Sequence, residues 1–349
     1  MIPLASPWGP SSPLDQVSIG RIIFIVTSLA AAIWVWRDIR IRFPRRHEET
    51  SAWLWEALLV GGTLVALPIF LPMYLIGARP VGAVTACPSC GRGTLSHRAT
   101  CLHCGHPIAF EAPPESWGLG EVVGVVIAIT VSLRVIAEAA GLNDLPPFTV
   151  LTVIGVAQNA LFVLLVVYIV RWRYHQPLAA IGLTAQRWPW WSALGVIAGA
   201  VMIPVSVAAE RVATLVIGLF IGPARAEAIA ANESANDILA SVLRTPRSSL
   251  EVAWLLVLLC VLVPIGEEVF FRGFIFSTLR RWGWAWAVTL SSLLFAAVHL
   301  QVVHFLPILL LGVVLTVLYQ RTGSLVASIA VHGVNNLIAA LASLYNWNI

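Results

Sequence analysis

The stretch Gly266-Glu267-Glu268-Val269-Phe270-Phe271-Arg272 places two carboxylates and an arginine inside an apolar run that is long enough to cross a membrane. Ionisable groups within a spanning segment are costly, so they tend to face a polar cavity or one another. Glu268 and Arg272 are four residues apart and therefore share one face of a helix, where we expect an ion pair. The stretch predicts a polar site inside a helical membrane protein.

The composition supports this membrane setting. The 349 residues are 59% hydrophobic and 11% charged, and the mean hydropathy is +0.87, whereas soluble domains carry about 25% charged residues. We therefore expect an all-α polytopic membrane protein with about eight to nine transmembrane helices of about 20 residues each. The candidate segments lie near residues 19–36, 53–77, 118–141, 148–170, 191–219, 251–271, 284–300, 304–320 and 324–345.

The basic residues are all arginine and gather at the ends of the apolar runs, which gives a net charge of +4. Short cytoplasmic loops are enriched in basic residues, so Arg171 and Arg173 mark the cytoplasm. Counting spans backward from there places residues 79–117 on the same side. We expect a multi-pass protein of the bacterial inner (plasma) membrane. No basic residue precedes the first apolar run, so we expect no cleaved signal peptide.

One region conflicts with this topology. The arginines between residues 37 and 46 would lie outside if the segment 53–77 crossed the membrane once. Pro68 and Pro72 could instead break that segment into a re-entrant hairpin, which would leave both basic regions inside. The sequence leaves both topologies open.

Four of the five cysteines form two CxxC pairs that are each followed by glycine, namely Cys87, Cys90, Cys101 and Cys104. Thiolates at this spacing reach one metal ion at about 2.3 Å. The pattern resembles a zinc ribbon and predicts a structural Zn²⁺. Two disulfides are the alternative, which the metal-like spacing and a reducing cytoplasm disfavour. The loop has only Arg92 and Arg98 as basic residues, so no nucleic acid is expected as a partner.

Two further polar pairs follow at helical spacing. Phe295 and His299 lie four residues apart in one apolar segment, as do His332 and Asn336 in another. Together with the Glu-Glu-x-x-x-Arg motif, these pairs resemble the motifs of the CPBP intramembrane proteases, the group that contains the type II CAAX prenyl endopeptidases. The resemblance implies a glutamate-type endopeptidase that hydrolyses a peptide bond of a membrane-associated peptide or protein.

The chemistry of peptide hydrolysis suggests a role for each residue of these motifs. We expect Glu267 to act as the general base on a water that it shares with His299. His332 and Asn336, one helical turn apart, would donate hydrogen bonds to the developing oxyanion. The whole expected catalytic set, with the supporting ion pair, is Glu267, Glu268, Arg272, His299, His332 and Asn336.

Several alternatives remain open. Glu267, His299 and His332 also form a ligand set for a catalytic zinc, although the resemblance favours a mechanism without an essential metal. Asn335 competes with Asn336 for the oxyanion role. A catalytically inactive relative that acts as a membrane scaffold or binding protein through its zinc ribbon is a second function class. A transporter whose buried charges line an ion path is a third.

The motifs suggest three parts of the chain. We expect N-terminal membrane segments in residues 1–78, the zinc ribbon in residues 79–110 and an intramembrane protease core in residues 118–349, with the motifs in residues 250–340. Within the apolar run 191–219, Glu210 and Arg211 could be a buried pair of adjacent charges, the lining of a cavity or the true end of the helix, and we favour the last two. The expected partners are membrane lipid and the membrane-associated peptide or protein substrate.

Overall fold

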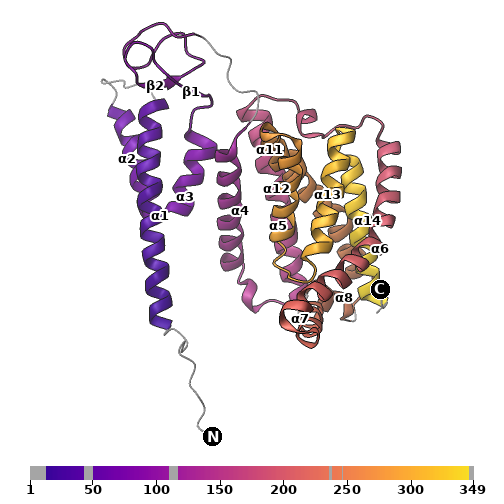
Figure 1. The fold of residues 1–349 in the computed structure, drawn as a ribbon. Helices are drawn as coiled ribbons and strands as arrows, with labels where there is room; N and C mark the ends of the chain where they lie inside the picture. Colours follow the sequence, from indigo (N-terminus) through magenta and orange to yellow (C-terminus); the bar gives the residue numbers. More distant parts are fainter. Residues whose placement is uncertain (1–12, 43–49, 110–116, 236–237, 246, 346–349) are drawn as a thin grey trace. The chain divides into compact units, whose positions relative to one another are not determined.

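The computed structural model describes residues 13–42, 50–109, 117–235, 238–245 and 247–345. These residues are almost entirely helical (Figure 1), which confirms the all-α class. Seven of the described helices are long and apolar enough to cross a membrane. The chain divides into two compact units, one formed by residues up to 115 with residues 123–131, the other by residues 116–122 and those from 132 onward.

The elements of the first unit are α1 (Pro13–Arg42), α2 (Thr50–Val65), α3 (Leu67–Pro72), η1 (Met73–Ala78), β1 (Val84–Ala86) and β2 (Gly93–Leu95). Helix α4 (Leu119–Ala139) contributes its middle to this unit and its ends to the other. The second unit contains η2 (Leu142–Asp144), α5 (Pro147–Val167), η3 (Tyr168–Arg173), η4 (Leu178–Ile181), α6 (Trp188–Ile221), α7 (Pro223–Ala235), α8 (Ile238–Arg244), α9 (Ser249–Val257), η5 (Leu258–Leu262), α10 (Val263–Glu268), η6 (Val269–Phe276), α11 (Ser277–Leu279), η7 (Arg280–Trp282), α12 (Trp284–Ala297), α13 (Phe305–Thr322) and α14 (Leu325–Tyr345).

The segment that was expected as one span at residues 53–77 is broken. The helix stops at Ala66, whose backbone leaves the helical region (φ −134°, ψ 58°). Pro68 lies in the first turn of the next helix, where its missing N–H breaks no helical hydrogen bond. Gly62 and Phe70 meet across the bend, since a Cβ at Gly62 would lie 2.4 Å from the Phe70 ring. Helices α2 and α3 therefore fold back on one another.

Both ends of this α2–α3 hairpin lie at the C-terminal end of α1. Arg40 Nε is 3.4 Å from Glu56 Oε1 in α2. Asp38 accepts a 2.8 Å hydrogen bond from Arg79 Nε, just after η1. The hairpin thus leaves and returns at one end of α1, as a re-entrant segment does. The described arginines before and after it, Arg40, Arg42 and Arg79, therefore lie near the same end of α1, the arrangement that the re-entrant alternative predicts.

The helical segment that carries the two glutamates runs from α9 to η7. Its start is fixed by a capping box, in which the Ser248 side chain accepts from the Glu251 N–H and the Glu251 carboxylate accepts from the Ser248 N–H. The π-helical turns η5 and η6 flank α10 on both sides. Such wide turns are frequent at functional sites, because they shift the register of the side chains that follow.

Helix α14 packs closely against two neighbours of the second unit. A Cβ at Gly195 of α6 would lie 2.5 Å from the Ala327 carbonyl oxygen of α14, and a Cβ at Gly333 of α14 would lie 2.6 Å from the Cys260 carbonyl oxygen of η5. Small residues at such crossings let membrane helices approach closely. Figure 1 shows α13 beside α14, and α13 also packs against α12. This packing brings the three motifs together.

Helix α12 is shorter than the sequence suggested. It ends at Ala297 after 14 residues, a length of about 21 Å at 1.5 Å per residue. A full crossing of the hydrocarbon core needs about 30 Å. The polypeptide after Ala297 leaves the helix before His299, so that histidine lies beyond the helical end rather than within a span.

Candidate active site

Glu268, Arg272 and His332 form a fully buried polar cluster. Arg272 Nη1 lies 2.7 Å from Glu268 Oε1, and neither side chain is accessible. His332 Nδ1 lies 3.0 Å from the same oxygen. Arg272 Nη2 donates to the Gly312 carbonyl oxygen at 3.2 Å, and its guanidinium lies 4.3 Å from the centre of the Phe295 ring. The ion pair expected from the sequence is present, and it links η6 to α12, α13 and α14.

Glu267 lies at the edge of this cluster. Its Oε2 is 3.8 Å from His332 Nε2, and its side chain is 14% exposed. That oxygen is buried and has no hydrogen-bond partner among the described residues. The paired Glu268 carboxylate only accepts, so His332 Nδ1 carries the proton between them and Nε2 faces Glu267. The distance from Nε2 to Oε2 exceeds that of a direct hydrogen bond.

His299 is connected to the cluster through Phe295. Its Nδ1 donates to the Phe295 carbonyl oxygen at 2.7 Å, which leaves Nε2 as the free ring nitrogen. The Phe295 ring centre is 5.0 Å from the His299 ring centre and 5.8 Å from that of His332. Within the described part of the chain, no hydrogen bond or ion pair joins His299 to Glu267. The water that these two residues were expected to share therefore stays a prediction.

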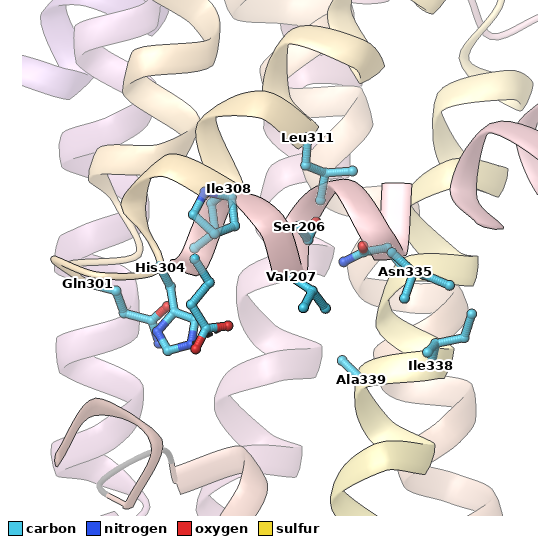
Figure 2. A pocket seen from close by; sticks show the side chains of 12 residues that line it. Ser206, Val207, Gln301, His304, Ile308, Leu311, Asn335, Ile338 and Ala339 are labelled. Atoms are coloured by element: carbon cyan, nitrogen blue, oxygen red, sulfur yellow. Dashed lines mark ion pairs between the residues drawn. The ribbon is translucent and has the colours of Figure 1, made fainter. Parts of the chain in front are cut away.

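The two neighbouring asparagines of α14 face different surroundings. Asn336 Nδ2 donates to the Leu259 carbonyl oxygen at 2.9 Å and so ties α14 to η5. Asn335 lines a cavity between α6, α13 and α14, as Figure 2 shows. Asn336 thus shares the η5 side with the glutamate-bearing helix, whereas Asn335 faces away toward α6. One amide hydrogen of Asn336 thus holds two helices together, and the sequence did not suggest this contact.

Sequence reasoning missed Asn159 of α5. A Cβ built on Gly266 would lie 2.2 Å from Asn159 Oδ1, so this amide occupies the space of the side chain that Gly266 lacks. Asn159 Nδ2 donates to the Gly155 carbonyl oxygen at 2.8 Å, while Oδ1 is buried and has no partner in the described residues. The signal available in the sequence was the pair of adjacent amides, Gln158 and Asn159, in an apolar segment. Asn159 abuts the backbone that precedes Glu267.

The four cysteine sulfurs gather within 4.8 Å of one another. The separation is 3.7 Å between the sulfurs of Cys87 and Cys104, and 3.8 Å between those of Cys90 and Cys101. Sulfurs that surround a tetrahedral Zn²⁺ at about 2.3 Å lie about 3.8 Å apart, whereas a disulfide joins them at about 2.05 Å. The cluster therefore fits a metal ion such as Zn²⁺ and does not fit two disulfides.

The local backbone builds both cysteine turns in the same way. Gly91 and Gly105 have φ values of +68° and +73°, and their N–H groups donate to the carbonyl oxygens of Cys87 and Cys101. Burial alone would raise the pKa of the Cys101 thiol, but backbone N–H groups of its turn donate to the sulfur and lower that pKa to about 6. A thiolate is the form that binds metal.

A catalytic zinc was a further possibility at the sequence level. Its ligand set, Glu267, His299 and His332, does not gather into a metal-binding group in the described ranges of the chain, where the four cysteines do. The imidazole of His332 is instead held by Glu268 through Nδ1. The arrangement of these side chains offers a carboxylate oxygen and an imidazole nitrogen that face each other at 3.8 Å.

Comparison with known proteins finds the same family. Residues 249–338 match the family described as Type II CAAX prenyl endopeptidase Rce1-like, and this confirms the resemblance seen in the motifs. The chain is also similar to UPF0177 protein YxdF of Lactococcus lactis subsp. lactis (strain IL1403), with 34% identity over 86 residues, which are 24% of this chain and 48% of that protein. The chain thus spans about half the length of this curated relative. No solved structure matches the chain.

Proposed function

Because residues 249–338 carry an Rce1-like domain, we propose that this chain is an intramembrane endopeptidase that hydrolyses a peptide bond of a membrane-associated peptide or protein. The observation that carries the proposal is the state of Glu267, whose Oε2 is buried, unpartnered among the described residues and 3.8 Å from His332 Nε2. A base needs such a free oxygen next to the place where water can sit.

In the proposed reaction, Glu267 takes a proton from a water molecule that His299 Nε2 helps to hold. The resulting hydroxide attacks the carbonyl carbon of the scissile bond. The protonated Glu267 then gives its proton to the leaving amine, so that one water is consumed and one new amino and one new carboxyl terminus form. Each step needs only the carboxyl group of Glu267 as proton carrier.

The tetrahedral intermediate carries a negative oxygen that needs hydrogen-bond donors. We assign this role to His332 and Asn336. Since Nδ1–H of His332 is bound to Glu268, donation to the oxyanion comes from Nε2 and requires a ring with both nitrogens protonated. Glu268 and Arg272 act as positioning residues, because their fully buried ion pair fixes the direction of the His332 ring.

The proposal extends to the metal and to the orientation. The four thiolates would hold a structural Zn²⁺, which would supply most of the folding free energy of a segment with only two short strands. The arginines at both ends of the α2–α3 hairpin favour a cytoplasmic location for the ribbon that follows it. A bacterial inner membrane is the expected site, with lipid and the substrate peptide as partners.

The test compares newly formed peptide termini in membranes that contain the wild-type chain, Glu267→Gln or Glu227→Gln. The first variant removes the base and keeps its shape, and the control changes an exposed carboxylate of α7. We expect termini specific to the wild type and the control. If Glu267→Gln yields the same termini at equal abundance and fold, the endopeptidase is refuted. The alternative is then a membrane scaffold that acts through its zinc ribbon and loses its function in Cys87→Ser.

A further inference from the structure

A cavity of about 240 Å³ lies between α6, α13 and α14 of the second unit. Its walls are aliphatic side chains of all three helices, and Figure 2 shows them around the opening. They include Val207 of α6, Ile308 and Leu311 of α13, and Ile338 of α14. Sites for drug-sized ligands are about 300–1,000 Å³. A cavity of this size and lining suits one long side chain better than a whole small molecule.

One end of the cavity is polar. Gln301 and His304 lie together there in Figure 2, and Glu210 completes this end with its Oε2 at 3.8 Å from His304 Nε2. The Glu210 side chain is 40% exposed, so a ligand can reach it. Helix α6 continues past Glu210 to Ile221. The carboxylate is therefore part of a cavity wall and does not mark the end of the helix.

The residues that line the cavity do not balance the negative charge at this end. His304 Nδ1 is 3.1 Å from Glu233 Oε2, so the ring faces a carboxylate on each side. Even if both nitrogens of the His304 ring are protonated, the ring and the two carboxylates together keep one negative charge. Burial raises the pKa of Glu233, but the N–H groups of Val302 and Val303 and the His304 ring lower it overall, which keeps that carboxylate ionised. No lysine or arginine is among the described residues that line the cavity.

The cavity adjoins the proposed active site along two chain segments. Gln301 follows His299 by two residues, and Asn335 lies three residues after His332 on α14. Residues three apart on a helix are neighbours on its surface. The cavity and the proposed active site thus share α14 and the segment that follows α12.

We propose that this cavity is a specificity pocket for one long basic side chain of the peptide substrate, lysine or arginine. The aliphatic stem packs against Ile308 and Ile338, and the cationic group is bound by the Glu210 carboxylate. Long basic side chains bury an apolar stem and keep a charged head at a polar site in this way. The inference rests on the proposed endopeptidase and names the chemistry that its substrate offers.

Binding can be tested without catalysis. The probes are pentylguanidinium and its neutral isostere pentylurea, titrated into full-length Glu267→Gln in phosphatidylcholine nanodiscs, with empty nanodiscs as the blank. We expect the cation to bind about tenfold more tightly, because hydrogen bonds to charged groups are stronger than neutral ones. Adding Glu210→Gln should reduce the difference to less than twofold, and adding Glu227→Gln should leave it unchanged. Equal affinities in Glu267→Gln, or a preference that survives Glu210→Gln, overturn the pocket.

Cleavage separates failure of the pocket from failure of the enzyme. Termini specific to wild-type membranes should show a basic residue at a fixed distance from the cut, and this enrichment should vanish in Glu210→Gln. If the termini specific to the wild type lack this enrichment, the specificity pocket is refuted, whereas the proposed endopeptidase activity is supported. If Glu267→Gln produces the wild-type termini, the endopeptidase fails, and the probe titration then decides whether the cavity binds cations.

Discussion

Replacing Arg272 alone should destabilise the protein more than replacing its whole ion pair. Both side chains of the pair are fully buried, and Arg272 also donates to the Gly312 carbonyl oxygen. In Arg272→Met the Glu268 carboxylate stays buried and loses its cationic partner, although His332 still donates to it. Removing one partner of a buried ion pair costs about 3–5 kcal/mol, because the other charge is left without compensation. Glu268→Gln should cost a similar amount for the same reason.

In the double variant Glu268→Gln with Arg272→Met, neither member of the ion pair is left as a charge without its partner. Glutamine keeps an acceptor for His332 Nδ1, and methionine fills much of the arginine volume. The lost interactions are then the hydrogen bond to Gly312, about 1 kcal/mol, and the cation–π contact with Phe295, about 2 kcal/mol in a desolvated site. The double variant should therefore cost about 3 kcal/mol, against about 6–10 kcal/mol for the sum of the single variants, a coupling of at least about 3 kcal/mol.

The measurement is the free energy of unfolding of each full-length variant in mixed micelles with increasing SDS, followed by far-UV circular dichroism. All four corners of the cycle are measured in the same lipid and detergent mixture. Additive costs, with a coupling within about 0.5 kcal/mol of zero, would refute the reasoning, because they would mean that the two charges do not depend on each other.

Three further predictions concern the other contacts. Cys87→Ser should abolish stoichiometric zinc, measured by metal analysis of the purified chain, and leave the helical circular dichroism intact; retained zinc would contradict the four-thiolate site. Gly266→Ala should cost about 1–3 kcal/mol, because the new methyl overlaps Asn159 Oδ1, and adding Asn159→Ala should recover most of that loss; no recovery would place the strain elsewhere. Asp38→Asn removes the carboxylate to which Arg79 donates and should lower the SDS midpoint, whereas an unchanged midpoint would show that the α2–α3 hairpin is held by other contacts.

The features that were predictable from the sequence are those set within one or two turns of the backbone. Glu268 and Arg272 are four residues apart, so helix geometry alone brings them together. Each pair of cysteines is joined by a turn whose glycine supplies the positive φ, so spacing alone predicts the thiolate cluster. Pro68 likewise made a break in its segment one of two open alternatives, and the helix stops two residues before it, at Ala66.

The features that the sequence did not reveal depend on how distant helices pack. His332 reaches Glu268 across 64 residues, and the motifs suggested that both lay in one site without indicating that they touch. Asn159 fills the space above Gly266, a contact that follows from the close approach of α5 and α10. Hydropathy predicts which residues avoid water, but it does not predict which helices pack against each other. The sequence suggested that Glu210 could line a cavity, but not that Asn335 and α13 lie on the other sides of it, for the same reason.

The contrast between the two adjacent glutamates supports the proposed division of roles. Glu268 has no exposed surface, and its Oε1 already receives both the Arg272 guanidinium and the His332 imidazole. A carboxylate held by two donors is stabilised in its charged form and is a poor proton acceptor. Both glutamates have a buried Oε2 without a hydrogen-bond partner in the described structure, but Glu267 also has some exposure and an imidazole nitrogen at 3.8 Å. Glu267 has fewer fixed partners and is thus free to exchange a proton. Glu268 holds the His332 ring that faces Glu267.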